Sequence, residues 1–297
     1  MPSVLKSFFV IAGLLLCIYA GLLLMLWARQ ERIVFQPPGP PFDEDSATTH
    51  VEYMASDGQP LFGYVVRPSS EGDSDGAQQP LTLIAFHGNA EIAAWSLPWA
   101  RELARRTRAN VLIAEYRGYA GLPGRPTYAG SKLDARAAFD YARTSLGAMP
   151  ERTVIYGHSL GSAIGVELAA EIKPRALLLE APFTSARAMA GRLGVPGILP
   201  LWRAISRVHY DTRTHVANLD VPVSVVHGAH DMVTPVHMGR EVFQAARRKG
   251  DLLILQNVGH NDVVETGGER YWDWLMRGMG GPVAPPEGVG PQPASRP

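Results

Sequence analysis

The chain is poor in cysteine and carries no excess of either charge. Of its 297 residues one is a cysteine, and 28 basic residues balance 28 acidic ones. Because Cys17 is the only cysteine, the sequence excludes a disulfide framework and a cysteine-based metal site. No basic stripe with interleaved aromatic residues occurs along the chain, so we expect no nucleic-acid partner.

Charge is also missing from residues 8–27, which read FFVIAGLLLCIYAGLLLMLW. At 1.5 Å per residue this run forms a helix of about 30 Å, the thickness of a hydrocarbon core. We expect an uncleaved membrane anchor over residues 1–30. A cleaved signal peptide with a cut after Ala20 is the competing interpretation, but Ile18 lies where a small residue is preferred. Basic residues flank both ends of the run, so the pattern assigns no side of the membrane to the rest of the chain.

Two further segments are expected to lie outside the folded domain. Residues 31–48 contain the proline-rich stretch FQPPGPPF, which predicts an extended spacer. Residues 279–297 contain almost no large apolar side chain, and we expect a disordered tail there. Length and composition leave residues 49–278 for one folded domain.

Within that domain, short apolar runs alternate with segments of helical periodicity. The apolar runs occupy residues 81–86, 110–116, 153–157, 176–180, 221–228 and 252–256, and the helical patterns occupy 91–108, 132–146, 160–172, 236–247 and 269–276. Two earlier runs, 50–55 and 61–66, flank the turn sequence SDGQ and predict antiparallel opening strands. The alternation predicts the α/β class, with a mostly parallel central sheet and helices on both faces.

The stretch VIYGHSLGSAIG sets Ser159 between two glycines, directly after a predicted strand and before a predicted helix. A sharp turn there can hold the serine hydroxyl up to solvent, but it brings the two backbones close together. Only small residues then fit two positions before and after the serine, and Gly157 and Gly161 meet that requirement. A simple glycine-flanked helix start explains the same glycines, so the assignment of Ser159 as a nucleophile depends on residues elsewhere.

Three further stretches supply what a serine nucleophile needs. FHGNA ends a predicted strand, where the backbone N–H groups of Asn89 and of Leu160 can hold a developing oxyanion. HGAHDMVTP places Asp231 in the loop after a predicted strand, and VGHND places His260 after the last one. An imidazole that takes the serine proton needs a carboxylate to fix its tautomer. The order therefore predicts Ser159 as nucleophile, Asp231 as orienting acid and His260 as base.

Two other carboxylates compete for the role of the acid. Glu180 ends an earlier predicted strand, and Asp262 lies two residues after His260. Chain geometry disfavours Asp262, because its side chain would have to fold back on its own backbone, and Glu180 is expected to brace the turn or a lid. In the loop EYRGY we expect Glu115 and Arg117 to form a bracing ion pair.

The motifs FHGNA, EYRGYAGLPGRPTYAG, YGHSLGSAIG, LLLEAPFTS, VVHGAHDMVTPVHM and GHND together resemble the α/β-hydrolase superfamily. Within it they are similar to the small membrane-anchored serine hydrolases of the bud-emergence (Bem) type, and the resemblance covers about residues 50–277. It implies an α/β-hydrolase fold preceded by an N-terminal transmembrane helix, with the site residues Ser159, Asp231, His260, Asn89 and Leu160 in the roles given above. The chain departs from its relatives at Ala120 and Ser162, where glycine is usual, and at Glu115, where aspartate is common.

The predicted function is that of a membrane-tethered serine hydrolase that cleaves carboxylic esters, or thioesters, through an acyl-enzyme on Ser159. No cofactor is needed, and His227, His230 and His237 lack the carboxylates of a metal site, so we expect no metal. The expected substrate is a small-molecule or lipid ester, reached past a short lid over residues 182–218; a helix pair packed on the core is the alternative for that insert. A peptidase with the same triad and a membrane-bound scaffold with a lapsed site stay open. The oligomeric state is not predicted.

Overall fold

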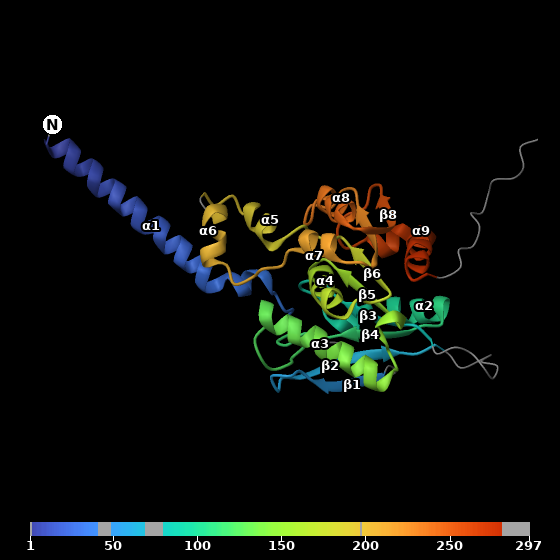
Figure 1. Cartoon of the computed structure of the whole chain (residues 1–297). Helices are drawn as coiled ribbons and strands as arrows, with labels where there is room; N and C mark the ends of the chain where they lie inside the picture. Colours follow the sequence, from blue (N-terminus) through green and yellow to red (C-terminus); the bar gives the residue numbers. More distant parts are fainter. Residues whose placement is uncertain (1, 41–48, 69–79, 197, 281–297) are drawn as a thin grey trace, which may run out of the picture.

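The computed structural model of the chain describes residues 2–40, 49–68, 80–196 and 198–280. Most of the tail expected at 279–297 therefore lies outside the described residues, as does the second part of the spacer expected at 31–48. The described residues form an eight-stranded sheet with helices against both faces, and a long N-terminal helix projects from this body (Figure 1).

The strands follow the order β1-β2-β4-β3-β5-β6-β7-β8 across the sheet. They are β1 (Thr49–Met54), β2 (Pro60–Val66), β3 (Thr82–Phe86), β4 (Asn110–Ala114), β5 (Thr153–His158), β6 (Ala176–Glu180), β7 (Pro222–Gly228) and β8 (Arg248–Leu255). β2 runs antiparallel to β1 and to β4, and all pairs from β4 to β8 are parallel. The predicted mostly parallel sheet with an antiparallel opening is confirmed. Ligands bind at the carboxyl edge of such sheets, so we expect a functional site among the loops that follow β3, β5, β7 and β8.

Helices cover both faces because successive side chains of a buried strand point to opposite sides. Ile84 and Phe86 of β3 belong to one core cluster, and Leu83 and Ala85 belong to the other. The covering helices are α3 (Tyr128–Ser145), α4 (Leu160–Ile172) and α8 (Val236–Ala245) on the first face, and α2 (Leu97–Thr107) and α9 (Val263–Gly278) on the second.

The structure differs most from the predicted helical ranges at two places, each for a local reason. The pattern at 91–108 divides into a short 3-10 turn, η1 (Ala93–Ser96), and α2, which carries a proline in its first turn. Proline is favoured there because the first backbone N–H groups of a helix have no partner within it. The last helix, α9, begins at Val263 rather than at 269 and contains one residue with non-helical backbone, Gly268, whose φ is +52°. Glycine adopts that left-handed backbone without the penalty that a side chain brings.

The N-terminal helix α1 (Pro2–Val34) is the one described helix that is long and apolar enough to cross a membrane, by length and composition. No part of its most apolar window is buried in the protein. The helix continues past residue 30, where the anchor was expected to end, because no proline interrupts it before Pro37. Phe35, directly after the helix, is 3% exposed and lies in the core. The segment expected to be a spacer therefore starts as helix and packed core.

The insert expected to form a lid, residues 182–218, contains three short helices. They are α5 (Ala186–Gly191), α6 (Ile198–Ile205) and α7 (Thr212–Asn218). α7 packs against α4 and contributes Val216 to the core, whereas α6 lies beside the last turns of α1 (Figure 1). The Tyr19 hydroxyl of α1 also donates a hydrogen bond to the Pro196 carbonyl oxygen of the insert. One part of the insert is thus packed on the core, and the other faces α1.

Candidate active site

Ser159 occupies a sharp turn between β5 and α4. Its backbone has φ +50° and ψ −112°, a conformation that residues other than glycine rarely adopt. A Cβ atom at Gly157 would collide with the Gly161 carbonyl oxygen, and one at Gly161 would collide with the Phe86 carbonyl oxygen. Since only glycine fits at these two positions, they allow the strand, the turn and the helix to approach closely. Ser159 therefore has the strand–turn–helix setting that its interpretation as a nucleophile requires.

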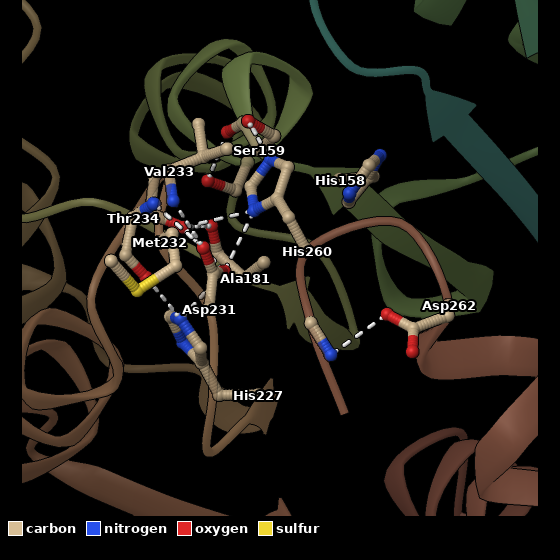
Figure 2. Close-up of polar contacts among 12 residues, drawn as sticks. His158, Ser159, Ala181, His227, Asp231, Met232, Val233, Thr234, His260 and Asp262 are labelled. Atoms are coloured by element: carbon tan, nitrogen blue, oxygen red, sulfur yellow. Dashed lines mark hydrogen bonds and ion pairs between the residues drawn. The ribbon is translucent and has the colours of Figure 1, made fainter. Parts of the chain in front are cut away.

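The three predicted triad residues lie together at the carboxyl edge of the sheet (Figure 2). His260 Nε2 lies 3.0 Å from Ser159 Oγ, and His260 Nδ1 lies 2.7 Å from Asp231 Oδ2. Asp231 follows β7 and His260 follows β8, so each is presented by a loop at this edge. Both distances are those of hydrogen bonds. A hydroxyl, an imidazole and a carboxylate joined in this order allow the imidazole to take the serine proton.

Asp231 is held by several donors at once. Its Oδ1 accepts the N–H groups of Val233 and Thr234, both at 2.8 Å. Its Oδ2 lies 2.9 Å from Thr234 Oγ1 and 3.1 Å from His227 Nε2, in addition to the contact with His260. Burial raises the pKa of Asp231, but the hydrogen bonds from His227 and His260 outweigh burial and hold that pKa well below its usual range. The charged carboxylate can therefore fix the proton of His260 on Nδ1.

Two residues that hold Asp231 in place were not predicted from the sequence. The Thr234 hydroxyl contacts Asp231 and also lies 3.0 Å from the Ala181 carbonyl oxygen, at the end of the neighbouring strand β6. His227 is fully buried, and its Nε2 lies 2.6 Å from the Thr234 carbonyl oxygen. Spacing indicates the first of them, because an aspartate often accepts the N–H groups two and three residues further on. His227 precedes Asp231 by four residues, and outside a helix this spacing does not indicate a contact between two side chains.

Asn89 and Leu160, the predicted oxyanion donors, line the same cavity as Ser159. Leu160 is the first residue of α4, where backbone N–H groups have no acceptor inside the helix. The side chain of Asn89 holds its own loop, since Oδ1 accepts the Gln36 N–H and the Tyr119 hydroxyl, both at 2.8 Å. The loop that carries the Asn89 N–H is thus tied to the segment that follows α1.

An ion pair joins the turn at Ser159 to the loop after β3. His158 Nδ1 lies 3.0 Å from Glu91 Oε1, and Glu91 Oε2 accepts the Gly88 N–H at 2.8 Å. Burial opposes the charge on both partners, but their mutual attraction outweighs it, so the pKa of His158 is raised to about 9 and that of Glu91 is lowered to about 2. The centre of the His158 ring lies 5.1 Å from that of His260. At neutral pH the pair is therefore charged and braces both sides of the site.

The two competing carboxylates belong to other hydrogen-bond networks. Glu180, at the end of β6, is buried and accepts a hydrogen bond from the Tyr156 hydroxyl. Asp262 Oδ1 accepts the Gly259 N–H at 2.8 Å, which closes the turn that carries His260. The geometry therefore favours Asp231 as the partner of the imidazole.

The predicted ion pair between Glu115 and Arg117 is wrong. Glu115 Oε1 lies 2.8 Å from His87 Nε2, and both side chains are fully buried. Arg117 instead donates to Asp134 at 2.8 Å and to Asp57 at 2.7 Å. A carboxylate buried this deeply requires a hydrogen-bond partner in the core, and His87 from the adjacent strand end supplies it. The loop EYRGY is still held in place, by the contact of Glu115 with His87 and by the contacts of Arg117 with the two aspartates.

A cavity of about 290 Å³ opens beside Ser159. This volume is near the lower end of the range for small-molecule sites. Its walls are mainly apolar and come from residues 183–210, from the end of α1 and from the site loops. Among the described residues, no group of three or more histidine, cysteine, aspartate and glutamate side chains could hold a metal ion.

The chain is similar in sequence and in fold to proteins of several organisms. A model of the Alpha/beta hydrolase family matches residues 83–219. An uncharacterized protein of Mycobacterium tuberculosis, Rv2307c, is 31% identical over 271 residues, which are 90% of this chain and 93% of that protein. The alpha/beta hydrolase domain-containing protein WAV2 of Arabidopsis thaliana is 30% identical over 281 residues, which are 86% of this chain and 88% of that protein. The Pyrococcus furiosus esterase Pf2001 has a similar fold, with a TM-score of 0.62 at 18% identity over 82% of this chain and 99% of that structure.

Proposed function

Because the chain belongs to the alpha/beta hydrolase family, we propose that it is a serine hydrolase that cleaves carboxylic esters, or thioesters, through an acyl-enzyme on Ser159. The observation that carries the proposal is the hydrogen-bonded path from Ser159 Oγ through His260 to Asp231, at 3.0 and 2.7 Å. Such a nucleophile is recognised by geometry and not by chain position. The mainly apolar cavity beside Ser159 supports an ester with an apolar acyl group as the substrate.

In the proposed reaction, His260 Nε2 takes the hydroxyl proton of Ser159 while Oγ bonds to the carbonyl carbon of the ester. Negative charge forms on the carbonyl oxygen, where the N–H groups of Asn89 and Leu160 are the proposed donors. His260 then gives its proton to the leaving alcohol or thiol as the bond to the carbonyl carbon breaks. Water attacks the acyl-enzyme, His260 takes a proton from it, and Ser159 regains its proton as the acid leaves. Asp231 stabilises the charged imidazole in both halves.

We also propose that α1 is an uncleaved anchor ahead of a catalytic domain at residues 49–278. The support is the apolar length of α1, which is sufficient to span a hydrocarbon core. A signal sequence near an N-terminus can also be helical and apolar, and a mature N-terminus at Gly21 would identify one. The quoted motifs further support assignment to the membrane-anchored serine hydrolases of the bud-emergence (Bem) type.

Labelling with a fluorophosphonate probe tests the enzymatic proposal, because the probe bonds covalently to an activated serine. We expect equal labelling of the unmodified chain and of Ser145→Ala, at an exposed serine of α3, and no labelling of Ser159→Ala. A scaffold with a lapsed site leaves all three unlabelled. An ester and an anilide of the same acyl group then separate the two enzyme classes. We expect turnover of the ester, whereas faster turnover of the anilide would favour a peptidase.

A further inference from the structure

The final turns of α1 form one wall of the cavity beside Ser159. The lining residues from this helix are Leu26, Trp27, Gln30, Ile33 and Val34. Their spacing places them on a single face of the helix. Among the described helices, α1 is also the one apolar enough to cross a membrane. The proposed anchor and the proposed acyl-binding cavity therefore share one helix.

Specific contacts hold the end of α1 against the insert. Gln30 Nε2 donates to the Ile205 carbonyl oxygen at 3.0 Å, and Gln30 Oε1 accepts the Arg207 N–H at 2.5 Å. The Arg207 guanidinium lies 4.2 Å from the centre of the Trp27 ring, in a cation–π contact. Phe35, the first residue after the helix, is buried in the core. These contacts give α1 a defined position beside the cavity, which a flexible tether would lack.

The cavity lies where the apolar stretch of α1 ends. Residues 8–27 carry no charge, and Arg29 is the first charged residue beyond them. About 20 helical residues span a hydrocarbon core, and tryptophan is enriched at the interface that bounds it. An α1 inserted in a bilayer therefore holds Trp27, and the cavity mouth beside it, at the membrane interface. Leu193 lines the cavity from the insert and is 53% exposed, so exposed apolar surface borders the cavity there as well.

We propose that the acyl chain of a membrane-resident ester or thioester enters this cavity directly from the bilayer, and that the cavity face of α1 selects the length of the chain. This inference rests on the proposed function of Ser159. The occupant is a single long acyl chain, with its carbonyl carbon at Ser159 and its methylenes against Trp27 and Ile33. A chain that moves from the bilayer into the cavity stays in apolar surroundings. Passage through water would slow entry by about fourfold for each exposed methylene.

The test uses the full chain in phosphatidylcholine vesicles with two fluorogenic umbelliferyl esters, a soluble acetate and a vesicle-embedded palmitate. The readout is the ratio of palmitate to acetate turnover per site labelled by fluorophosphonate. Ile33→Trp narrows the cavity from the side of α1. We expect this variant to lower the ratio by about tenfold or more. The larger side chain excludes two or three methylenes of the palmitate chain from the cavity, and each excluded methylene lowers the palmitate rate by about fourfold.

Leu24→Trp is the matched control, since it adds bulk to α1 at a 63% exposed position that does not line the cavity. We expect its ratio to stay within about twofold of that of the unmodified chain. Trp27→Ala is a second variant that removes bulk from the wall, and with umbelliferyl esters of graded acyl length it should move the chain-length optimum toward longer acyl chains. It keeps the proposal testable if Ile33→Trp fails to fold.

Addition of lipid at a constant amount of palmitate ester tests the route of entry. We expect the palmitate rate to fall, because it follows the fraction of substrate in the vesicle surface. If the palmitate rate does not change when lipid is added, the proposal that the substrate enters from the bilayer is overturned. An unchanged ratio in Ile33→Trp with an unchanged optimum in Trp27→Ala overturns the selective role of α1. If the unmodified chain shows neither labelling nor acetate turnover, the proposed serine hydrolase itself is refuted, which is a separate result.

Discussion

Asp231→Asn replaces one carboxylate oxygen by an NH₂ group and keeps the size of the side chain. In the structure Oδ1 accepts two backbone N–H groups, from Val233 and Thr234, whereas Oδ2 faces the two histidines. The asparagine will keep its oxygen toward the backbone donors, so its NH₂ group will face His227 and His260. Because an NH₂ group can only donate, His260 Nδ1 must become an acceptor, and the imidazole proton moves to Nε2.

That tautomer cannot take the serine proton, since the protonated Nε2 is the atom 3.0 Å from Ser159 Oγ. In a serine protease the same exchange lowers kcat by about 10⁴-fold with the geometry intact. We expect Asp231→Asn to lower kcat by about 10³- to 10⁴-fold, which is about 4 to 5.5 kcal/mol in the activation barrier. Stability should change much less. His227 Nε2 retains its hydrogen bond to the Thr234 carbonyl oxygen, which is 2.6 Å long in the structure. We therefore expect the free energy of unfolding to fall by only about 1 kcal/mol.

Steady-state hydrolysis of a soluble chromogenic ester measures kcat, and urea unfolding measures stability. Glu180→Gln and Asp262→Asn are matched controls, because each removes one negative charge from a carboxylate outside the path to Ser159. We expect each control to lower kcat by less than about tenfold. If Asp231→Asn keeps a nearly normal kcat and Glu180→Gln loses most of it, the orienting acid is Glu180 at the end of β6 and the reasoning is refuted.

Three further predictions concern the turn, the ion pair of His158 and Glu91, and the anchor. Gly161→Ala should abolish fluorophosphonate labelling and lower the melting temperature, because its Cβ would meet the Phe86 carbonyl oxygen; normal labelling contradicts the turn geometry. The ion pair of His158 and Glu91 should stabilise the fold most between pH 4.5 and 6.5, the unperturbed pKa values of the two groups. Its contribution is lost as pH rises through about 9, where folded His158 deprotonates, and as pH falls through about 2, where folded Glu91 protonates. The difference in melting temperature between the unmodified chain and Glu91→Gln should therefore shrink at high pH, and a constant difference is evidence against the pair. Carbonate-washed membranes should retain the chain, whereas its recovery in the supernatant contradicts an anchor.

Local patterns in the sequence were sufficient to predict the fold class, the turn and the order of the candidate triad. The alternation of apolar runs and helical segments reflects burial on both faces of a sheet, which depends on neighbours a few residues apart. Gly157 and Gly161 are required by the close approach of one strand to the next helix, which is also a local condition. The loops that carry Asp231 and His260 meet at one edge, because parallel strands all end on the same side.

Only the tertiary structure decided which side chains from distant segments become partners. Glu115 binds His87 and not Arg117, because β4 lies beside β3 in the sheet, and strand order is not encoded in the periodicity of either strand. The role of His227 beside Asp231 likewise depends on how the loop after β7 folds back on its own strand. The position of α1 against α6 also follows from contacts between segments about 175 residues apart, at Gln30 and Ile205. A hydrophobic run specifies a helix by itself, but which surface that helix covers depends on the packing of the whole chain.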